Sequence, residues 1–272
     1  MAGQRPGWRA ALLLLGLAAA VAGPAGQTPA PGTERVRVLS YNIHHGEGVD
    51  TVLDLERIAR VIRSVDPDLV ALQEVDRKAT RSGSIDQPAE LARLTGLQAV
   101  FGPNIPLQGG DYGNAVLSRW RILESENHRL PNVDAGEQRG LLEVHVEAPA
   151  TKARVVLWAT HFDHRKSDAE RVASVQALRA RIGPQADRPA LLAGDLNDVP
   201  ASRTLAALAA DWTRTNADVL PTIPVGTPAR QIDYVLFRPA GRWRAIETRV
   251  LDEAVASDHR PIFAVLELRA AP

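Results

Sequence analysis

Polar side chains with catalytic potential stand where apolar segments of this sequence end. The segments VLSYN, LVALQE, VVLWATH and ALLAGDLN each close on amide, carboxylate or imidazole groups, and ASDH directly precedes the last apolar run. The residues at these positions are Asn42, Glu74, His161, Asp195, Asn197, Asp258 and His259. Each could be an ordinary turn or surface residue, but five polar ends at the same kind of position indicate one site on a rigid scaffold.

The residue types at these positions indicate the chemistry. Carboxylate and amide oxygens are the donors that hard divalent cations prefer, and amide and imidazole N–H groups bind phosphoryl oxygens. The chain contains no cysteine, which excludes a thiolate metal site, a cysteine nucleophile and a disulfide framework. The polar ends therefore predict a site for a divalent cation and a phosphate group.

The elements that must position these residues alternate between short apolar strands and helical patterns. We predict strands over 36–44, 69–75, 115–120, 141–148, 154–162, 190–197, 232–238 and 262–268. We predict helices over 50–65, 87–96, 167–183 and 200–210. Asp50 is the expected cap of the first helix, and Ser167 with Glu170 the expected capping box of the third. Several strands are almost continuously apolar, as in sheets covered on both faces. This mixture predicts an α/β (α+β) protein built in layers, as one domain from 34 to 270.

The N-terminus has the pattern of a secretory signal peptide. Arg5 and Arg9 precede or flank the start of the apolar run ALLLLGLAAAVAG, and small residues follow it. We predict a signal peptide over 1–22 and a disordered leader over 23–33, so that the mature protein is secreted or periplasmic. An uncleaved anchor is the alternative, although the run is short for crossing a bilayer. No second apolar run of spanning length follows, so we expect no transmembrane segment in the mature chain.

The charge balance bears on the partners of the protein. The whole chain has 32 basic and 32 acidic residues, and cleavage near Ala22 removes Arg5 and Arg9, which leaves 30 basic residues. A mature chain close to neutral lacks the basic excess typical of a general nucleic-acid binder. Nucleic acid is therefore a partner that we do not favour, and we predict no protein partner.

The motifs along the chain resemble those of a known family. In order, the sequence contains YNIH, LVALQEVD, GNAVLSRW, ATHFDHR, AGDLNDVP, IDYVLF and ASDHRPI. Together they resemble the endonuclease/exonuclease/phosphatase superfamily, the deoxyribonuclease I-like metal-dependent phosphoesterases, in a secreted bacterial form and over nearly all of the mature chain. GDLN and SDH are the most specific of these motifs. The resemblance implies a four-layer αββα sandwich of two packed mixed β-sheets.

The resemblance also implies a metal side of the site. Glu74 corresponds to the family's principal divalent-metal ligand, and Asn42 lies beside it on the metal side, where it helps to orient metal-bound water and phosphate. Asp258 corresponds to a further carboxylate on the metal side. The implied cofactor is Mg²⁺, with Mn²⁺ and Ca²⁺ as alternatives.

The remaining motif residues correspond to catalytic groups. Asp195 matches the carboxylate that positions or deprotonates the attacking water, and Asn197 matches an amide that binds phosphate. His259 matches the imidazole that stabilises the transition state or protonates the leaving group, with Asp233 as the carboxylate that orients it. His161 matches a second histidine on the phosphate side. An imidazole held by a carboxylate keeps one tautomer and favours its protonated form, as an acid requires.

Three further residues are candidates for binding substrate. Arg77 and Arg81 follow Glu74 in a charged segment. They could hold a second phosphate or a headgroup, or they could belong to a solvated loop. Asn114, in the segment YGNAVLSR, could line the cleft.

Additional histidines suggest an alternative class of enzyme, a zinc hydrolase. His161 and His164 in HFDH are similar to the end of the metallo-β-lactamase ligand motif, and His44 and His45 add imidazoles elsewhere. The motif needs another histidine two residues upstream, where this chain has Ala159. A zinc site would also leave the carboxylates and amides of the other motifs unexplained.

These observations together predict a divalent-metal-dependent phosphoester hydrolase, and we favour a small or headgroup phosphoester as its substrate. A secreted nuclease is an alternative that would need basic stripes along its surface. A sphingomyelinase-like phospholipase is another, but it would need exposed aromatic residues for membrane docking, and aromatic residues make up 4% of the chain. A non-catalytic phosphate-binding module is a more remote alternative, because Glu74, Asp195 and His259 are all present.

Overall fold

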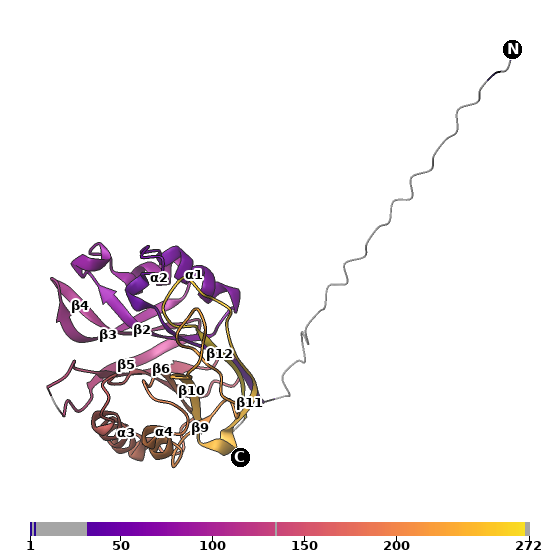
Figure 1. The fold of residues 1–272 in the computed structure, drawn as a ribbon. Coiled ribbons are helices and arrows are strands. Elements are labelled where there is room, and N and C mark those ends of the chain that lie inside the picture. The colour runs from indigo at the N-terminus through magenta and orange to yellow at the C-terminus, as the bar shows by residue number, and fades with distance from the viewer. Residues whose placement is uncertain (2, 4–31, 134, 270–272) are drawn as a thin grey trace.

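Two six-stranded β-sheets pack face to face in this computed structural model, which describes residues 1, 3, 32–133 and 135–269 (Figure 1). The first sheet has the strand order β11 (Trp243–Val250), β12 (Ile262–Leu268), β1 (Glu34–Asn42), β2 (Leu69–Arg77), β4 (Gly110–Ser118), β3 (Gln98–Leu107). The second has the order β5 (Arg121–Arg129), β6 (Gly140–Glu147), β7 (Arg154–His161), β8 (Ala190–Asp195), β10 (Asp233–Arg238), β9 (Thr213–Arg214). Both sheets are mixed, because β1 runs parallel to β2 and β7 runs parallel to β8, while the other paired strands are antiparallel.

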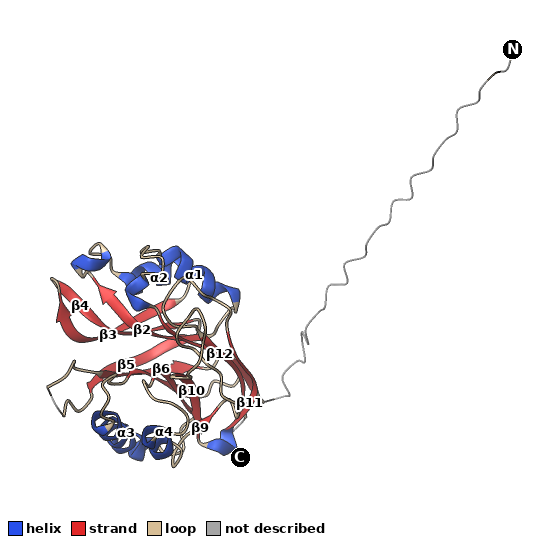
Figure 2. Cartoon of the chain, in the orientation of Figure 1, coloured by secondary structure: helices blue, strands red, loops and turns tan. Residues whose placement is uncertain are grey.

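Helices cover the outer face of each sheet (Figure 2). The first sheet is covered by α1 (Leu55–Ser64) and α2 (Gln87–Thr95), and the second by α3 (Ala169–Ile182) and α4 (Arg203–Leu208). Short 3₁₀ turns complete the chain: η1 (His44–Gly46), η2 (Thr80–Ser82), η3 (Gly183–Gln185) and η4 (Ala240–Arg242). The architecture is the predicted four-layer αββα sandwich of two mixed sheets.

Three apolar layers hold the sandwich together. The central layer lies between the sheets and contains buried side chains from both, including Val36, Leu69, Leu157 and Ile262. Two outer layers join each sheet to its helices. The inner strands thus bury both faces, which explains why their sequences are almost continuously apolar.

Three of the four predicted helices, α1, α3 and α4, begin later than predicted, whereas α2 begins at Gln87 as predicted. Asp54, not Asp50, caps α1, and its side chain accepts a hydrogen bond from the backbone N–H of Arg57. The predicted capping box of α3 is absent, because Asp168 occupies the cap position without a side-chain hydrogen bond. The carboxylate of Glu170 instead pairs with Arg165 at 2.6 Å. The Glu170 side chain therefore forms a partly buried ion pair and does not cap the helix.

The predicted signal peptide and leader lie outside the described residues, apart from residues 1, 3, 32 and 33. Their assignment stays a prediction. In the described part of the chain, none of the helices combines the length and the apolar character that crossing a membrane requires.

Candidate active site

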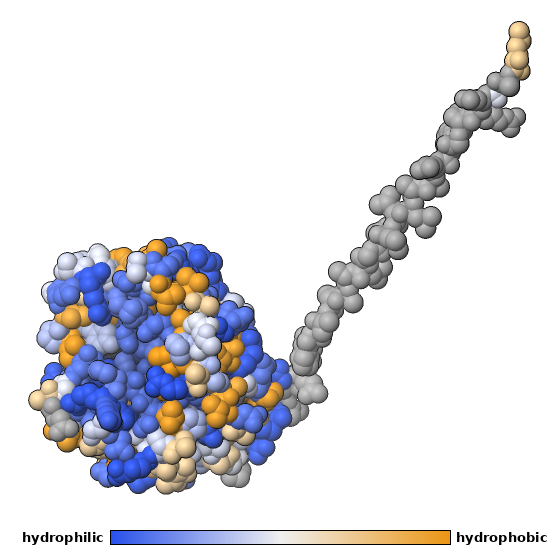
Figure 3. Space-filling view, viewed as in Figure 1, coloured by the Kyte–Doolittle hydropathy of each residue, from blue (hydrophilic) through white to orange (hydrophobic). Residues whose placement is uncertain are grey.

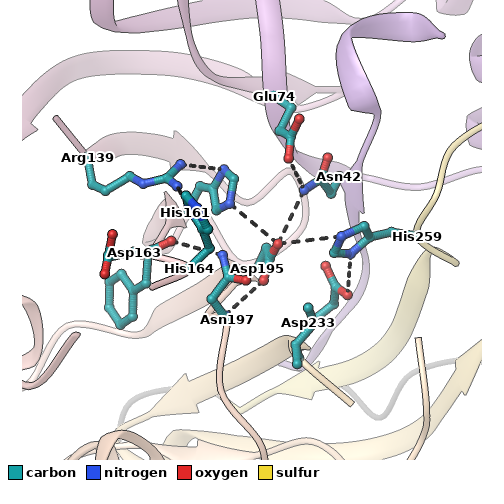
Figure 4. A network of polar contacts seen from close by, with 12 residues as sticks. Asn42, Glu74, Arg139, His161, Asp163, His164, Asp195, Asn197, Asp233 and His259 are labelled. Carbon is teal, nitrogen blue, oxygen red and sulfur yellow. Dashed lines mark hydrogen bonds and ion pairs between the residues drawn. The ribbon is translucent and has the colours of Figure 1, made fainter. Parts of the chain in front are cut away.

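The predicted polar strand ends meet at one edge of the sandwich, between the two sheets. In the first sheet, the parallel pair β1 and β2 carries Asn42 and Glu74. In the second, the parallel pair β7 and β8 ends at His161 and Asp195, which lie opposite each other. Asp233 begins β10 and lies opposite Asp195 on its other side. The two parallel pairs and the start of the antiparallel strand β10 therefore bring these five side chains together (Figure 4).

Asn42 links the carboxylates of the two sheets. Its buried amide nitrogen donates to Glu74 Oε1 at 2.9 Å and to Asp195 Oδ2 at 3.2 Å. Its amide oxygen accepts the backbone N–H of His44 at 3.1 Å. The side chain thus orients two carboxylates, and its oxygen is occupied by the backbone, whereas the sequence assigned Asn42 to the metal ligands.

Glu74 lies on an irregular part of β2. The pairing between β2 and β4 shifts register between Leu72 and Val75, and Glu74 has a φ of 57° in the left-handed region. Such a backbone conformation costs about 1 to 3 kcal/mol for a residue with a side chain, and it is concentrated at functional sites. The bulge turns the Glu74 carboxylate into the cleft, where it is half-buried.

His259 is held by a buried carboxylate from the opposite sheet. Its Nδ1 lies 2.9 Å from Asp233 Oδ2, and Asp233 also accepts a hydrogen bond from the Thr222 hydroxyl at 2.5 Å. Burial alone would lower the pKa of His259, but the negative charges of Asp233 and Asp195 raise that pKa to about 10. The imidazole is therefore protonated at neutral pH, with Nε2–H facing Asp195 Oδ2 at 3.8 Å.

The environment of Asp195 favours its neutral form, whereas that of His259 favours the charged form. Burial and the negative charge of Asp233 raise the pKa of Asp195 to about 7, partly opposed by His259. Asn197, which follows in a left-handed conformation with a φ of 50°, donates its backbone N–H to Asp195 Oδ1 at 2.8 Å. One N–H of the Asn197 side chain donates to the Phe162 carbonyl at 3.0 Å, and the residue lines the cleft.

Arg139 determines the tautomer and the charge of His161. This buried guanidinium donates from Nη1 to His161 Nδ1 at 3.0 Å and from Nη2 to His164 Nδ1 at 3.1 Å. Arginine has no acceptor, so Nδ1 of His161 must accept and the proton lies on Nε2. Burial and the positive charge of Arg139 hold the pKa of His161 well below its usual range. His161 is therefore a neutral N–H donor that faces Asp195 Oδ2 at 3.5 Å.

These residues line a cleft of about 520 Å³. Asp258 also lines it, immediately after Ser257, whose hydroxyl donates to the Asn42 carbonyl at 2.7 Å and ties the SDH segment to β1. Arg260, directly after His259, pairs with Asp252 at 2.7 Å and has a structural role. The cleft thus collects every predicted catalytic residue except the fully buried Asp233, which supports His259 from behind.

The three candidate substrate residues have different positions. Arg81 lines the cleft, but it is bound through two hydrogen bonds of 2.8 Å to the buried Asp76. Arg77 turns away to pair with Asp111 at 2.6 Å and lines a different surface hollow. Asn114 is buried and donates to the Gly140 carbonyl at 3.1 Å, next to Arg139 in the chain. Arg77 and Asn114 are therefore not brought to the cleft.

The geometry disfavours the metallo-β-lactamase-like alternative. His161 and His164 both direct Nδ1 at the Arg139 guanidinium, so a cation lies between them already. Ala159, at the position where that motif needs a histidine, is buried in the central apolar layer. The zinc-hydrolase interpretation of HFDH therefore does not fit this structure.

Sequence reasoning missed several cleft residues. Arg139 and Glu137 precede β6, and Arg230 precedes β10. Tyr112 lies on β4, and its pKa is raised by burial and by the charge of Glu74. None belongs to a motif with recognisable spacing, and only the position of Arg139 in EQRG, directly before a strand, could have drawn notice.

The fold and the composition of this cleft define a class, the phosphoesterases built on a four-layer sandwich. Residues 39–259 match the family model of the Endonuclease/Exonuclease/phosphatase family, so the chain belongs to that family. It is 28% identical over 246 residues to the protein YbhP of Escherichia coli strain K12, covering 85% of this chain and 96% of that one.

Solved structures agree with this assignment. A Beutenbergia cavernae protein described as an endonuclease/exonuclease/phosphatase is 30% identical, with a TM-score of 0.75, over 88% of this chain and 73% of that one. A Bacteroides thetaiotaomicron protein described as the mannosyl-6-phosphatase Bt3783 is 19% identical, with a TM-score of 0.70, over 85% of this chain and 99% of that one. The second likeness shows the fold alone.

Proposed function

We propose that the protein is a divalent-metal-dependent hydrolase of small or headgroup phosphoesters. The observation that carries this proposal is the pair formed by Asp195 and His259. Asp195 has a pKa of about 7 and His259 a pKa of about 10, and the two groups face each other at 3.8 Å in one cleft. Two groups with separated pKa values supply a base and an acid at the same pH.

The residues of the cleft divide the work of hydrolysis. Asp195, with its pKa near neutral, accepts the proton of the attacking water. His259, protonated and held by Asp233, donates toward the leaving oxygen. The neutral Nε2–H of His161 and the side chain of Asn197 donate to non-bridging phosphoryl oxygens, where negative charge develops.

The oxygen donors of the cleft fit a divalent cation. Glu74 and Asp258 both line it, and Asn42 fixes one oxygen of Glu74 while the other remains available. Carboxylate oxygens of this kind suit Mg²⁺, Mn²⁺ or Ca²⁺. A cation bound there acts as a Lewis acid on a phosphoryl oxygen.

The surface around the cleft favours a small substrate. Two of its three arginines are paired, Arg81 with Asp76 and Arg139 with Glu137 at 2.8 Å, so little free positive charge remains for a polyanion. The exposed large hydrophobic residues of the described chain are Met1, one isoleucine and five valines, with no aromatic side chain for lipid docking. The face in Figure 3 is mainly hydrophilic, which agrees with this reading.

Turnover of a substrate panel tests the proposal. The metal-stripped chain should hydrolyse bis-p-nitrophenyl phosphate or an inositol phosphate when Mg²⁺ is added, in preference to DNA or sphingomyelin. Asp195→Asn should lower kcat by about 100- to 10,000-fold, because it removes the base. Asp218→Asn, at an exposed aspartate outside the cleft, is the matched control. Wild-type turnover by Asp195→Asn, or no turnover with any divalent cation, would refute the proposal.

We further propose that the protein is exported after removal of residues 1–22. The apolar run that follows Arg9 supports this location. Expression in a bacterial host followed by N-terminal sequencing of the fractionated protein tests it. A mature N-terminus near residue 23 in the periplasm or medium is expected, and an intact N-terminus in the cytoplasm would contradict it.

A further inference from the structure

Two histidines beside Glu74 have no part in the hydrolysis just described. His44 and His45 form the turn η1 directly after β1, and each offers a ring nitrogen close to the Glu74 carboxylate. One ligand atom from each of the three residues lies within 4.8 Å of the other two. We call His44, His45 and Glu74 the histidine–glutamate cluster.

The hydrogen bonds of His44 leave one nitrogen free to bind a cation. Its Nδ1 lies 3.0 Å from the Glu47 carbonyl oxygen. A carbonyl only accepts, so Nδ1 carries the proton and Nε2 keeps its lone pair. Histidines that bind metals are held in this way, with the second nitrogen donating to a carbonyl or a carboxylate.

His45 shows the complementary arrangement. Its Nε2 lies 3.7 Å from the Glu47 carboxylate, while its Nδ1 is buried and has no hydrogen-bond partner among the described residues. The side chain is 12% exposed, so water does not readily satisfy that nitrogen. A histidine with only a packing role would pair both ring nitrogens, because a buried polar atom without a partner costs about 1 to 3 kcal/mol. A bound cation would satisfy Nδ1.

The backbone around the cluster is held in place. The buried Gln87 donates to the His45 carbonyl at 2.6 Å and accepts the Asp76 N–H at 2.9 Å, which ties the turn to β2. Gly46 has a φ of 81°, and a Cβ there would lie 2.8 Å from Leu55. These contacts fix the turn beside β2, and the two imidazole ring centroids lie 4.5 Å apart.

We propose that the histidine–glutamate cluster binds a divalent first-row transition ion that accepts imidazole ligands, such as Co²⁺, Ni²⁺ or Zn²⁺, in preference to Mg²⁺. Two imidazoles and one carboxylate are a donor set that such ions accept, whereas Mg²⁺ prefers oxygen ligands. Donors around one such ion lie about 3 to 3.5 Å apart. Side-chain rotation of the half-buried Glu74 would bring its carboxylate from the present spacing of up to 4.8 Å to the spacing that a bound ion requires. The site shares Glu74 with the proposed catalytic cation, and its test needs no substrate.

Binding of Co²⁺ to the metal-stripped full chain is the test. Nitrogen ligation gives Co²⁺ visible absorption bands, which report on the cluster directly. The variants His44→Asn and His45→Asn suit the test, because asparagine tolerates the left-handed φ values of 44° and 45° at these positions. Each should weaken Co²⁺ binding at least about 10-fold. His164→Asn removes an imidazole from the same cleft but outside the cluster, and it should keep the wild-type spectrum.

Selectivity is measured by competition. Zn²⁺ should displace Co²⁺ at equal concentration, while an excess of Mg²⁺ of about 100-fold should leave the spectrum unchanged. Wild-type affinity in both histidine variants, confirmed as folded by circular dichroism, would overturn the proposal, and so would displacement by Mg²⁺. Intact Co²⁺ binding in a chain that hydrolyses no phosphoester would count against the proposed function and leave the cluster standing.

Discussion

A guanidinium group only donates hydrogen bonds, and Arg139 therefore decides which nitrogen of His161 carries a proton. The sequence presented His161 as a conspicuous strand end, but the residue that sets its chemistry lies 22 positions earlier and contacts it only in the fold. In the proposed mechanism, neutral His161 with Nε2–H is therefore a donor to phosphate, and His259 is the acid.

Arg139→Met tests this role. The change removes the donor and the positive charge, so His161 should populate both tautomers and its pKa should rise, while burial still keeps it below the usual value. Side-chain ¹⁵N NMR measures both quantities. We expect kcat to fall at least about 10-fold, because losing one aligned donor outright costs about 100-fold or more.

The control for this experiment is Arg203→Met, which removes an exposed arginine paired with Asp168 outside the cleft. It should leave the His161 resonances and kcat unchanged. An Nε2–H tautomer of His161 that persists at the same pKa in Arg139→Met would show that another group determines its state.

The charge of Asp233 links both limbs of the pH–rate profile. It raises the pKa of His259 to about 10 and contributes to the pKa of Asp195 of about 7. Activity should rise as Asp195 loses its proton and fall as His259 loses its own, and these apparent values belong to the coupled pair. Asp233→Asn removes the charge, so both pKa values fall and both limbs move to lower pH.

Initial rates from about pH 5 to about pH 12, two units beyond each limb, measure this shift. Thr222→Val is the matched control, because it removes the hydroxyl donor to Asp233 and keeps the negative charge. Its two limbs should stay near those of the wild type. Limbs that move in opposite directions in Asp233→Asn would contradict the shared electrostatic origin.

At the residue scale, the sequence predicted those side chains whose position follows from a strand end. Asn42, His161 and Asp195 meet because they end parallel strands at one edge of the sandwich, and the irregular part of β2 adds Glu74 to them. It could not place Arg77, because the ion-pair partner that holds its side chain, Asp111, lies on the neighbouring strand β4 and is known only from the fold.

At the scale of elements, the sequence predicted the inner strands of both sheets but not their edge strands. All eight predicted strands are present, and the four that were missed, β3, β5, β9 and β11, are the four sheet edges. Edge strands bury less surface and carry charges and prolines that discourage aggregation. β5 reads RILESENHR and β3 contains Pro103 and Pro106, so neither shows an apolar run.

One edge strand also contributes a buried polar cluster that affects stability. Glu143 on β6 accepts hydrogen bonds from His145 at 2.6 Å and from His128 of β5 at 2.8 Å. Burial opposes its charge, but these bonds and one from Gln185 lower the pKa of Glu143 to about 2. A depressed carboxyl pKa stabilises the fold above the unfolded value of about 4.3, and this contribution is lost as pH falls toward 2.

Glu143→Gln should therefore lower the free energy of unfolding at pH 7, with a difference from wild type that narrows between about pH 4 and pH 2. Urea denaturation across this range measures it. Glu126→Gln, at an exposed residue beside His128, should have the free energy of unfolding of the wild type over the whole pH range. A difference that stays constant down to pH 2 would mean that the lost stability does not come from the charge of Glu143.

At the scale of the whole molecule, the active site is divided between the two sheets. Asn42 and Glu74 lie on strands of the first sheet and His259 shortly before its strand β12, whereas Asp195 and Asp233 lie on strands of the second sheet. Direct hydrogen bonds across the division run from Asn42 to Asp195 and between His259 and Asp233. The distances that matter for catalysis therefore depend on how the central apolar layer spaces the sheets.

Two leucine truncations separate this spacing from stability in general. Leu157 lies in the central layer and Leu178 in the outer layer under α3, and both are fully buried. Leu157→Ala and Leu178→Ala should each cost about 2 to 5 kcal/mol of unfolding free energy. Only the first leaves a cavity between the sheets that carry the two halves of the site. Because a displacement of about 1 Å can cost on the order of 100-fold in rate, Leu157→Ala should lose more kcat per folded molecule than Leu178→Ala. The test compares the kcat values of the two variants under conditions in which circular dichroism shows both to be folded. Equal kcat values would mean that the sheets keep their spacing without the Leu157 side chain.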